Sequence, residues 1–134
     1  NMFDIIGIRF INDSYDAFSE ITIKDNTFSG TYAIDAENKS VTLNGRNTDM
    51  STFGEIYKSI AAITMDGEAI NPLPEGAASV GEIRLVYSSG DVLVLKFYEY
   101  DNNYYAVERN GSIDFITGKR SLLQITEAVK ALVQ

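Results

Sequence analysis

Two carboxylates beside a group of tyrosines are the side chains whose types and spacing come closest to a chemical site. Glu99 and Glu108 lie on adjoining predicted strands in YEYDNNYYAVERNG, residues 98–111. Two carboxylates are sufficient for glycoside hydrolysis, which needs no histidine. The alternation of DVLVLKFYEY, residues 91–100, favours placing both acids on the face opposite Tyr98, where acids are usually only solvated. We therefore predict no catalytic residue and no enzyme.

The tyrosines of the same stretch form the candidate binding surface. If Asn102 and Asn103 make a two-residue turn, Tyr100 faces Tyr105 across the hairpin, and Tyr98 shares their face. Such a patch would offer rigid apolar rings with polar tips to a sugar or to a protein loop. Tyrosine is also an ordinary strand residue, so packing of these rings under a helix is the alternative that strand composition favours.

The composition excludes several classes of function. The chain has no histidine and no cysteine, which removes the common nucleophile pairs, the usual zinc sites and thiol chemistry. DNNYY, residues 101–105, lacks the glycine and glutamate of a calcium loop, and GKRS, residues 118–121, lacks the upstream glycine of a phosphate loop. We predict no metal and no cofactor.

The charge of the chain argues against nucleic acid and acidic membrane as partners. The net charge is −8, and Lys119-Arg120 is the only adjacent basic pair, so phosphate groups are repelled. No window approaches the 18 apolar residues of a membrane span. The chain begins Asn1-Met2 without a signal peptide, and we expect it to be a piece of a longer protein whose anchor lies upstream.

A shift of the sequence by 66 positions places YAIDAENKSVTLNG, residues 32–45, on residues 98–111. Tyr, Asp, Val, Asn and Gly coincide, and Tyr98 aligns with Tyr32. Each copy follows an alternating apolar segment and ends in Asn-Gly, the pair typical of a type I′ turn. Each copy also precedes an amphipathic segment. We infer an internal duplication, with half-repeats at about 19–66 and 81–134.

The amphipathic segments predict one helix in each half. The first has an apolar stripe from Phe53 to Ile63, and Thr48, Asp49 or Ser51 can cap its start, with Gly67 as its terminator. The second begins with a predicted capping box at residues 121–124. Its apolar side comprises Leu122, Ile125, Val129, Leu132 and Val133.

These elements predict an α+β fold with a mainly antiparallel sheet and two helices, built from two β-β-β-α units. Further strands are expected at residues 5–11 and 113–117. Residues 66–81 contain both prolines and three glycines, and they form the expected connector. It either joins two sub-domains or crosses over within one sheet. Because each half is marginal for its own core, we favour a single domain over residues 1–134.

The stretches VTLNGRNTDMSTFGEIYKSIAAI, VLKFYEYDNNYYAVERNG and IDFITGKRSLLQITEAVKAL resemble an uncharacterised bacterial domain family of Gram-positive species. Members of that family lie outside the membrane behind an anchor or a lipoprotein signal. The resemblance runs from about residue 20 to the C-terminus and implies a β-rich α+β module at the cell envelope. It implies no active-site residues.

The leading hypothesis is a non-enzymatic, extracytoplasmic binding or assembly module of an envelope protein, with an unidentified protein or glycan partner. One alternative is an acidic inhibitor or immunity-type protein that covers a basic enzyme surface. A further alternative is a glycan-binding or glycan-active domain that uses the face of Tyr98, Tyr100 and Tyr105. That alternative requires the three tyrosines to lie together and exposed.

Overall fold

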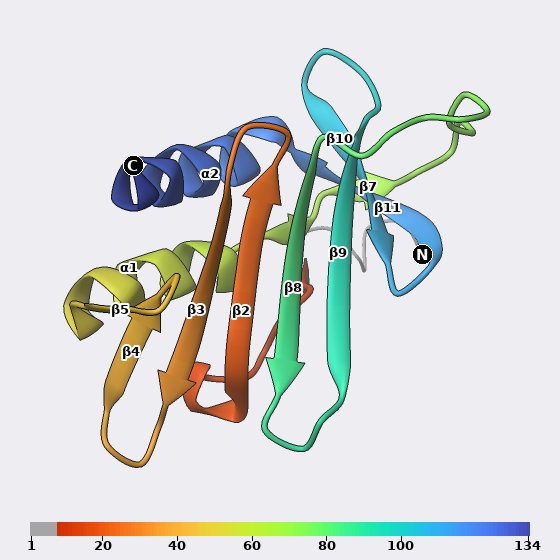
Figure 1. Ribbon diagram of the computed structural model, residues 1–134. Helices are drawn as coiled ribbons and strands as arrows, with labels where there is room; N and C mark the ends of the chain where they lie inside the picture. Colours follow the sequence, from red (N-terminus) through yellow and green to blue (C-terminus); the bar gives the residue numbers. More distant parts are fainter. Residues whose placement is uncertain (1–7) are drawn as a thin grey trace.

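The computed structural model describes residues 8–134, which form an α+β fold with a nine-stranded, mainly antiparallel sheet (Figure 1). The strand order is β5-β4-β3-β2-β8-β9-β10-β11-β7, and β1 pairs with β6 in a separate small sheet. The first half comprises β1 (Ile8–Arg9), the short 3-10 helix η2 (Tyr15–Ala17), β2 (Phe18–Asp25), β3 (Ser29–Asp35), β4 (Ser40–Leu43), β5 (Arg46–Thr48), α1 (Met50–Ala61) and β6 (Thr64–Met65). It is followed by β7 (Gly67–Glu68), β8 (Gly81–Tyr87), β9 (Val92–Glu99), β10 (Tyr104–Arg109), β11 (Ser112–Gly118) and α2 (Lys119–Val133).

The two halves of the chain share one sheet. Each half contains four consecutive antiparallel strands followed by a helix, and the halves meet where β2 pairs with β8. The connector therefore crosses over within one sheet, and its first residues form the edge strand β7. Of the strand predicted at residues 5–11, Ile8–Arg9 is present as β1 and residues 5–7 lie outside the described part of the chain.

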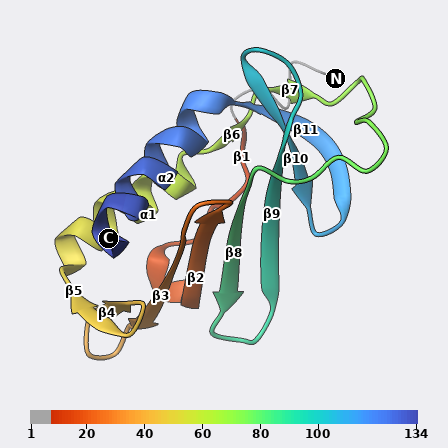
Figure 2. The same cartoon turned by 45° about the horizontal axis from the view of Figure 1, so that its top comes forward.

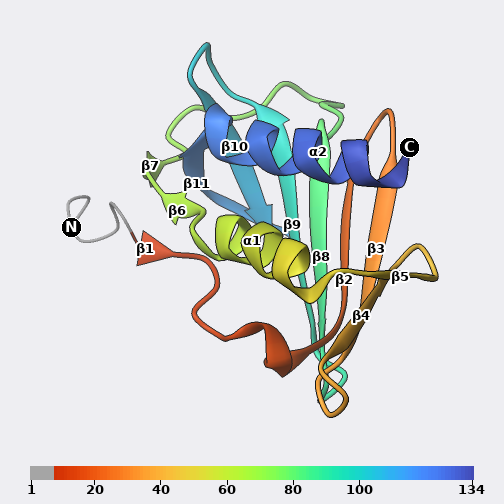
Figure 3. The same cartoon turned by 90° about the vertical axis from the view of Figure 1, so that its left-hand side faces the viewer.

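Both helices pack on the same face of the sheet (Figures 2 and 3). They bury equivalent positions, spaced i, i+3, i+4 and i+7, because these positions form one stripe on a helix. The buried residues are Phe53, Ile56, Tyr57 and Ile60 in α1, and Leu122, Ile125, Thr126 and Val129 in α2. The predicted stripes are thus confirmed except at Leu132, which is exposed in the last turn of α2.

The start of α1 was predictable from neighbouring residues, and the start of α2 was not. Asp49 caps α1 by accepting a hydrogen bond from the Thr52 amide at 3.0 Å. The helix ends at Ala61, well before the predicted terminator Gly67, which lies in β7. The capping box at Ser121 is wrong, because α2 begins at Lys119. Its N-terminal acceptor is Asp66, whose Oδ2 accepts from the Gly118 amide at 2.7 Å.

The two Asn-Gly pairs form the predicted two-residue turns. Asn44 and Gly45 have φ of 51° and 83°, and Asn110 and Gly111 have φ of 48° and 96°. Such positive values at both positions are the requirement of a type I′ turn. Each asparagine also extends the sheet, because its Oδ1 accepts a backbone N–H from the preceding strand: that of Thr31 in β3 for the first turn and that of Val94 in β9 for the second.

Asn110→Ala is expected to lower the free energy of unfolding by about 2 kcal/mol. The substitution removes the 2.8 Å hydrogen bond from Val94 and places alanine at a positive φ. Urea denaturation of the variant and of Asn110→Gly, which tolerates the turn but lacks the side chain, separates the two contributions. Equal stability of wild type and Asn110→Ala would contradict this explanation.

Tyr32 is fully buried, and its hydroxyl has no hydrogen-bond partner among the described residues. The ring packs against Phe53, with centroids 4.9 Å apart. Because an unpaired buried hydroxyl opposes folding, Tyr32→Phe is expected to raise the free energy of unfolding by about 1 kcal/mol. Urea denaturation checks this, with Tyr57→Phe as the control that loses a hydrogen bond to the Asp13 carbonyl. A loss of stability in Tyr32→Phe would show that its hydroxyl is paired.

Candidate functional site

The predicted three-tyrosine face is not formed. Tyr105 pairs with Glu99 instead of Tyr100, so the register differs by one residue from the prediction. The connection between β9 and β10 is longer than two residues, because Asp101 accepts the amides of Asn103 and Tyr104 and closes a wider loop. Because side chains alternate along a strand, a shift of one residue in register moves every side chain of the shifted strand to the opposite face. The exposed tyrosine platform that a glycan-binding function would need is therefore absent from residues 98–105.

Each of the three tyrosines has its own structural environment. Tyr105 lies on the helix side, 6% exposed, with its ring against Phe97 and the Lys119 ammonium. Tyr100 lies after the end of β9, where its hydroxyl oxygen accepts the backbone amides of Ile70 and Asn71 at 3.2 and 3.1 Å. Tyr98 is half-buried on the other face of the sheet. Tyr100 thus holds the connector, and Tyr98 alone faces the side without helices.

The predicted position opposite Tyr98 is confirmed for Glu99 and is wrong for Glu108. Glu108 lies on the same face as Tyr98, whose hydroxyl donates to Glu108 Oε1 at 3.3 Å. Burial, together with the Glu108 carboxylate, raises the pKa of Tyr98, so its hydroxyl remains a donor. Glu99 lies on the opposite face and forms an ion pair with Lys119. The two acids therefore flank no common space, as a glycosidase pair would.

One face of the sheet carries neither helix, and we call it the bare face (Figures 1 and 3). Its side chains alternate along each strand with those that enter the core. Around its centre, a shallow hollow of about 420 Å³ opens between β8, β9 and the turn after β10. The exposed or partly exposed residues at the centre of the bare face are Glu20, Thr22, Lys24, Ala33, Glu82, Arg84, Val86, Val92, Val94, Lys96, Tyr98 and Glu108.

Four of these residues form a row of alternating charge across four strands. Lys24 of β2 lies opposite Glu82 of β8, Glu82 opposite Lys96 of β9, and Lys96 opposite Glu108 of β10. Lys24 Nζ is 3.7 Å from Glu82 Oε2. Opposite charges in directly facing positions stabilise neighbouring strands. We call Lys24, Glu82, Lys96 and Glu108 the charged row.

The bare face is locally neutral although the chain is acidic. On this face, the strands β2, β8, β9 and β10 present three basic side chains, Lys24, Arg84 and Lys96. The three acids that they present on it are Glu20, Glu82 and Glu108. The net charge of −8 therefore belongs to the rest of the surface. A neutral face on an acidic protein is the part of the surface that another acidic protein can approach most closely.

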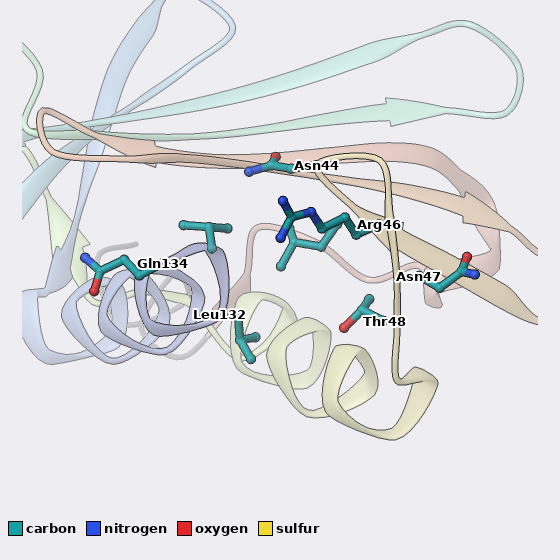
Figure 4. Close-up of a pocket in the computed structure, with 8 residues that line it drawn as sticks. Asn44, Arg46, Asn47, Thr48, Leu132 and Gln134 are labelled. Carbon is teal, nitrogen blue, oxygen red and sulfur yellow. The ribbon is translucent and has the colours of Figure 1, made fainter.

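A second hollow, of about 330 Å³, lies between β5 and the last turn of α2 (Figure 4). Arg46 extends toward the end of α2, where a cation interacts favourably with the helix dipole. The other lining side chains are amides, a hydroxyl and aliphatic groups: Leu43, Asn44, Asn47, Thr48, Leu132, Val133 and Gln134. Apart from Arg46, the side chains of this lining are uncharged, and none of them is a carboxylate.

Residues 8–134 contain no cluster of three acidic side chains arranged to hold a metal ion. Among the same residues, neither helix has the length and apolar content needed to cross a bilayer. Comparison of the chain with protein-family models, curated proteins and solved structures found no match. The bare face, with its charged row, is thus the surface feature that bears on function.

Proposed function

We propose that this protein is a non-enzymatic binding or assembly module that recognises a protein partner through the bare face. The observation that carries the proposal is the local neutrality of this face within a chain of net charge −8. An acidic surface repels most cellular polyanions and many proteins, whereas a neutral face with paired charges permits close approach.

The side chains of the bare face suit protein recognition better than catalysis. Val86, Val92 and Val94 provide apolar surface between the charges, and Tyr98 provides an aromatic ring. Glu82 lies beside Lys24, and Glu108 accepts the hydroxyl of Tyr98, so each acid has a structural partner. Specific interfaces combine apolar contacts with charges that fix the register of the partner.

An internal duplication is part of the proposal. The strand order is symmetric about the β2–β8 pair, and both asparagine turns make the same hydrogen bonds to the preceding strand. In sequence, equivalent positions lie 63 residues apart in the strands that donate to the asparagines and 66 residues apart at the turns themselves. In the helices they lie 69 residues apart. The second copy would therefore carry two insertions of three residues, and Tyr32 would correspond to Leu95 instead of Tyr98.

We further propose that the module acts outside the cytoplasm, held at the envelope by a segment upstream of Asn1. The resemblance to anchored envelope domains supports this placement. Protease added to intact cells that carry an epitope-tagged full-length protein should remove the epitope. Protection of the epitope until the cells are lysed would favour the alternative of a cytoplasmic immunity-type protein.

Site-specific photo-cross-linking of the full-length protein in cells tests the binding surface. Ala33 is exposed on the bare face, and Ala128 is exposed on α2, so a photoreactive amino acid in place of either is a matched pair. We expect a discrete cross-linked protein from position 33 and none from position 128. Cross-links only from position 128 would place the binding surface on the helices.

A further inference from the structure

We propose that the partner of the bare face is a second copy of the same chain, packed sheet on sheet through the charged row. This inference rests on the proposed function, because it names the partner of the same surface. The order of charges along the row permits two copies to pair with each other. Read across the strands it runs positive, negative, positive, negative, and the reversed row has the complementary order.

The order of charges selects one orientation of the two copies. A two-fold axis parallel to the strands, between β8 and β9, reverses the row of the second copy. Lys24 then lies over Glu108 of the other copy, and Glu82 lies over Lys96. All four contacts join opposite charges, and packed sheets whose strands are nearly aligned are a common arrangement. An axis parallel to the row would instead place each charge over its own equivalent.

The remaining side chains of the bare face agree with this orientation. Val86 and Val92 face each other across β8 and β9, so each valine lies over the other valine of the second copy. Arg84 and Val94 are likewise paired across these strands, so the arginine lies over an aliphatic side chain and meets no like charge. The selected axis therefore brings apolar side chains together beside the four charge pairs.

Long-range electrostatics favour contact through this face over contact elsewhere. Each copy carries a net charge of −8, so two copies repel unless they meet where the charge is balanced. The bare-face side chains of β2, β8, β9 and β10 provide that balance. The repulsion between the remaining surfaces is screened by salt, whereas the close pairs are screened less. We expect association to strengthen from low to moderate ionic strength.

The available area predicts a weak dimer. Four neighbouring strands, β2, β8, β9 and β10, lie symmetrically about this axis and give a footprint of roughly 450 Å² on each copy, at about 4.8 Å between strands and about seven residues along each. A total of roughly 900 Å² lies slightly below the lower limit of stable specific interfaces, in the range of weak and transient contacts. Self-association should therefore be visible only at high protein concentration, or when a second module in the full-length protein raises the local concentration.

Charge reversal and mixing test the orientation. Lys96→Glu places two acids over each other in the dimer, and Glu82→Lys places two bases over each other. Each variant alone should bind itself at least about tenfold more weakly than wild type in sedimentation equilibrium. An equimolar mixture of the two should recover association, because every contact in the mixed dimer then joins opposite charges. Lys58→Glu, an equal change of charge on exposed α1, should associate like wild type.

Reversal of all four residues of the charged row guards against loss of folding in the single variants. This variant keeps every opposite-charge neighbour within the chain, and it should dimerise with itself but not with wild type. A wild type that stays monomeric at its highest soluble concentration would overturn self-association. Self-association through the charged row would also be overturned if an equimolar mixture of Lys96→Glu and Glu82→Lys did not recover association. The proposed function fails separately, when position 33 cross-links to no protein in cells.

Discussion

Asp66→Ala is expected to lower the free energy of unfolding by about 3 kcal/mol. Asp66 Oδ2 accepts the amide of Gly118 at 2.7 Å, and Oδ1 accepts the Thr64 hydroxyl at 2.6 Å. Charge-assisted hydrogen bonds of this kind contribute more than neutral ones, and a carboxylate at a helix N-terminus interacts favourably with the helix dipole. Without the carboxylate, the half-buried start of α2 loses its acceptor.

Urea denaturation at neutral pH measures the change, and Asp66→Asn is the informative companion. The amide keeps one oxygen acceptor but removes the charge, so its loss of stability should lie between those of wild type and Asp66→Ala. Glu68→Ala, an exposed acid two residues away in β7, should have little effect. Equal stability of wild type and Asp66→Ala would show that α2 does not depend on this contact.

Gly30→Ala should lower the free energy of unfolding by about 2–3 kcal/mol, because β3 has no room for a side chain beneath α2. A Cβ at Gly30 would lie 2.7 Å from Val129 Cγ1 and 3.4 Å from Leu43 Cδ1. Contacts this short force a shift of the helix or of its side chains, and overpacking of a filled core is destabilising. Val129 is fully buried, so it cannot turn into solvent.

A double-mutant cycle separates this clash from a general effect of substitution in the strand. Val129→Ala alone should destabilise the protein by about 2 kcal/mol, since it leaves a cavity. The double variant Gly30→Ala, Val129→Ala should cost at least about 1 kcal/mol less than the sum, because the new methyl occupies the space vacated by the valine. Strict additivity would show that the two positions do not contact each other.

Features that depend on neighbouring residues were predictable from the sequence. The Asn-Gly turns follow from the local preference for positive φ, and the buried stripes of both helices follow from their 3.6-residue spacing. The alternation of residues 91–100 likewise placed Val94, Lys96 and Tyr98 on one face. In each case the determining interaction lies within a few residues of the chain.

Features that depend on distant residues were not predictable. The cap of α2 comes from Asp66, far from residue 118 in sequence, so the local signal at Ser121 was misleading. The register of β9 and β10 depends on the Asp101 loop, and one residue of difference separated Tyr98 from Tyr105. The charged row requires β2 to lie beside β8, because only this pairing brings Lys24 next to Glu82.

Lysine footprinting in intact cells tests most directly whether the bare face is covered by protein. Lys24 and Lys96 lie on the bare face, whereas Lys58 and Lys130 lie on the helices. The acetylation rate of each lysine in the full-length protein in cells is divided by its rate in the dilute purified protein. We expect this ratio to fall several-fold for Lys24 and Lys96 relative to Lys58 and Lys130. Unchanged ratios at Lys24 and Lys96, with protection of Lys58 instead, would contradict the assignment of the bare face as the binding surface.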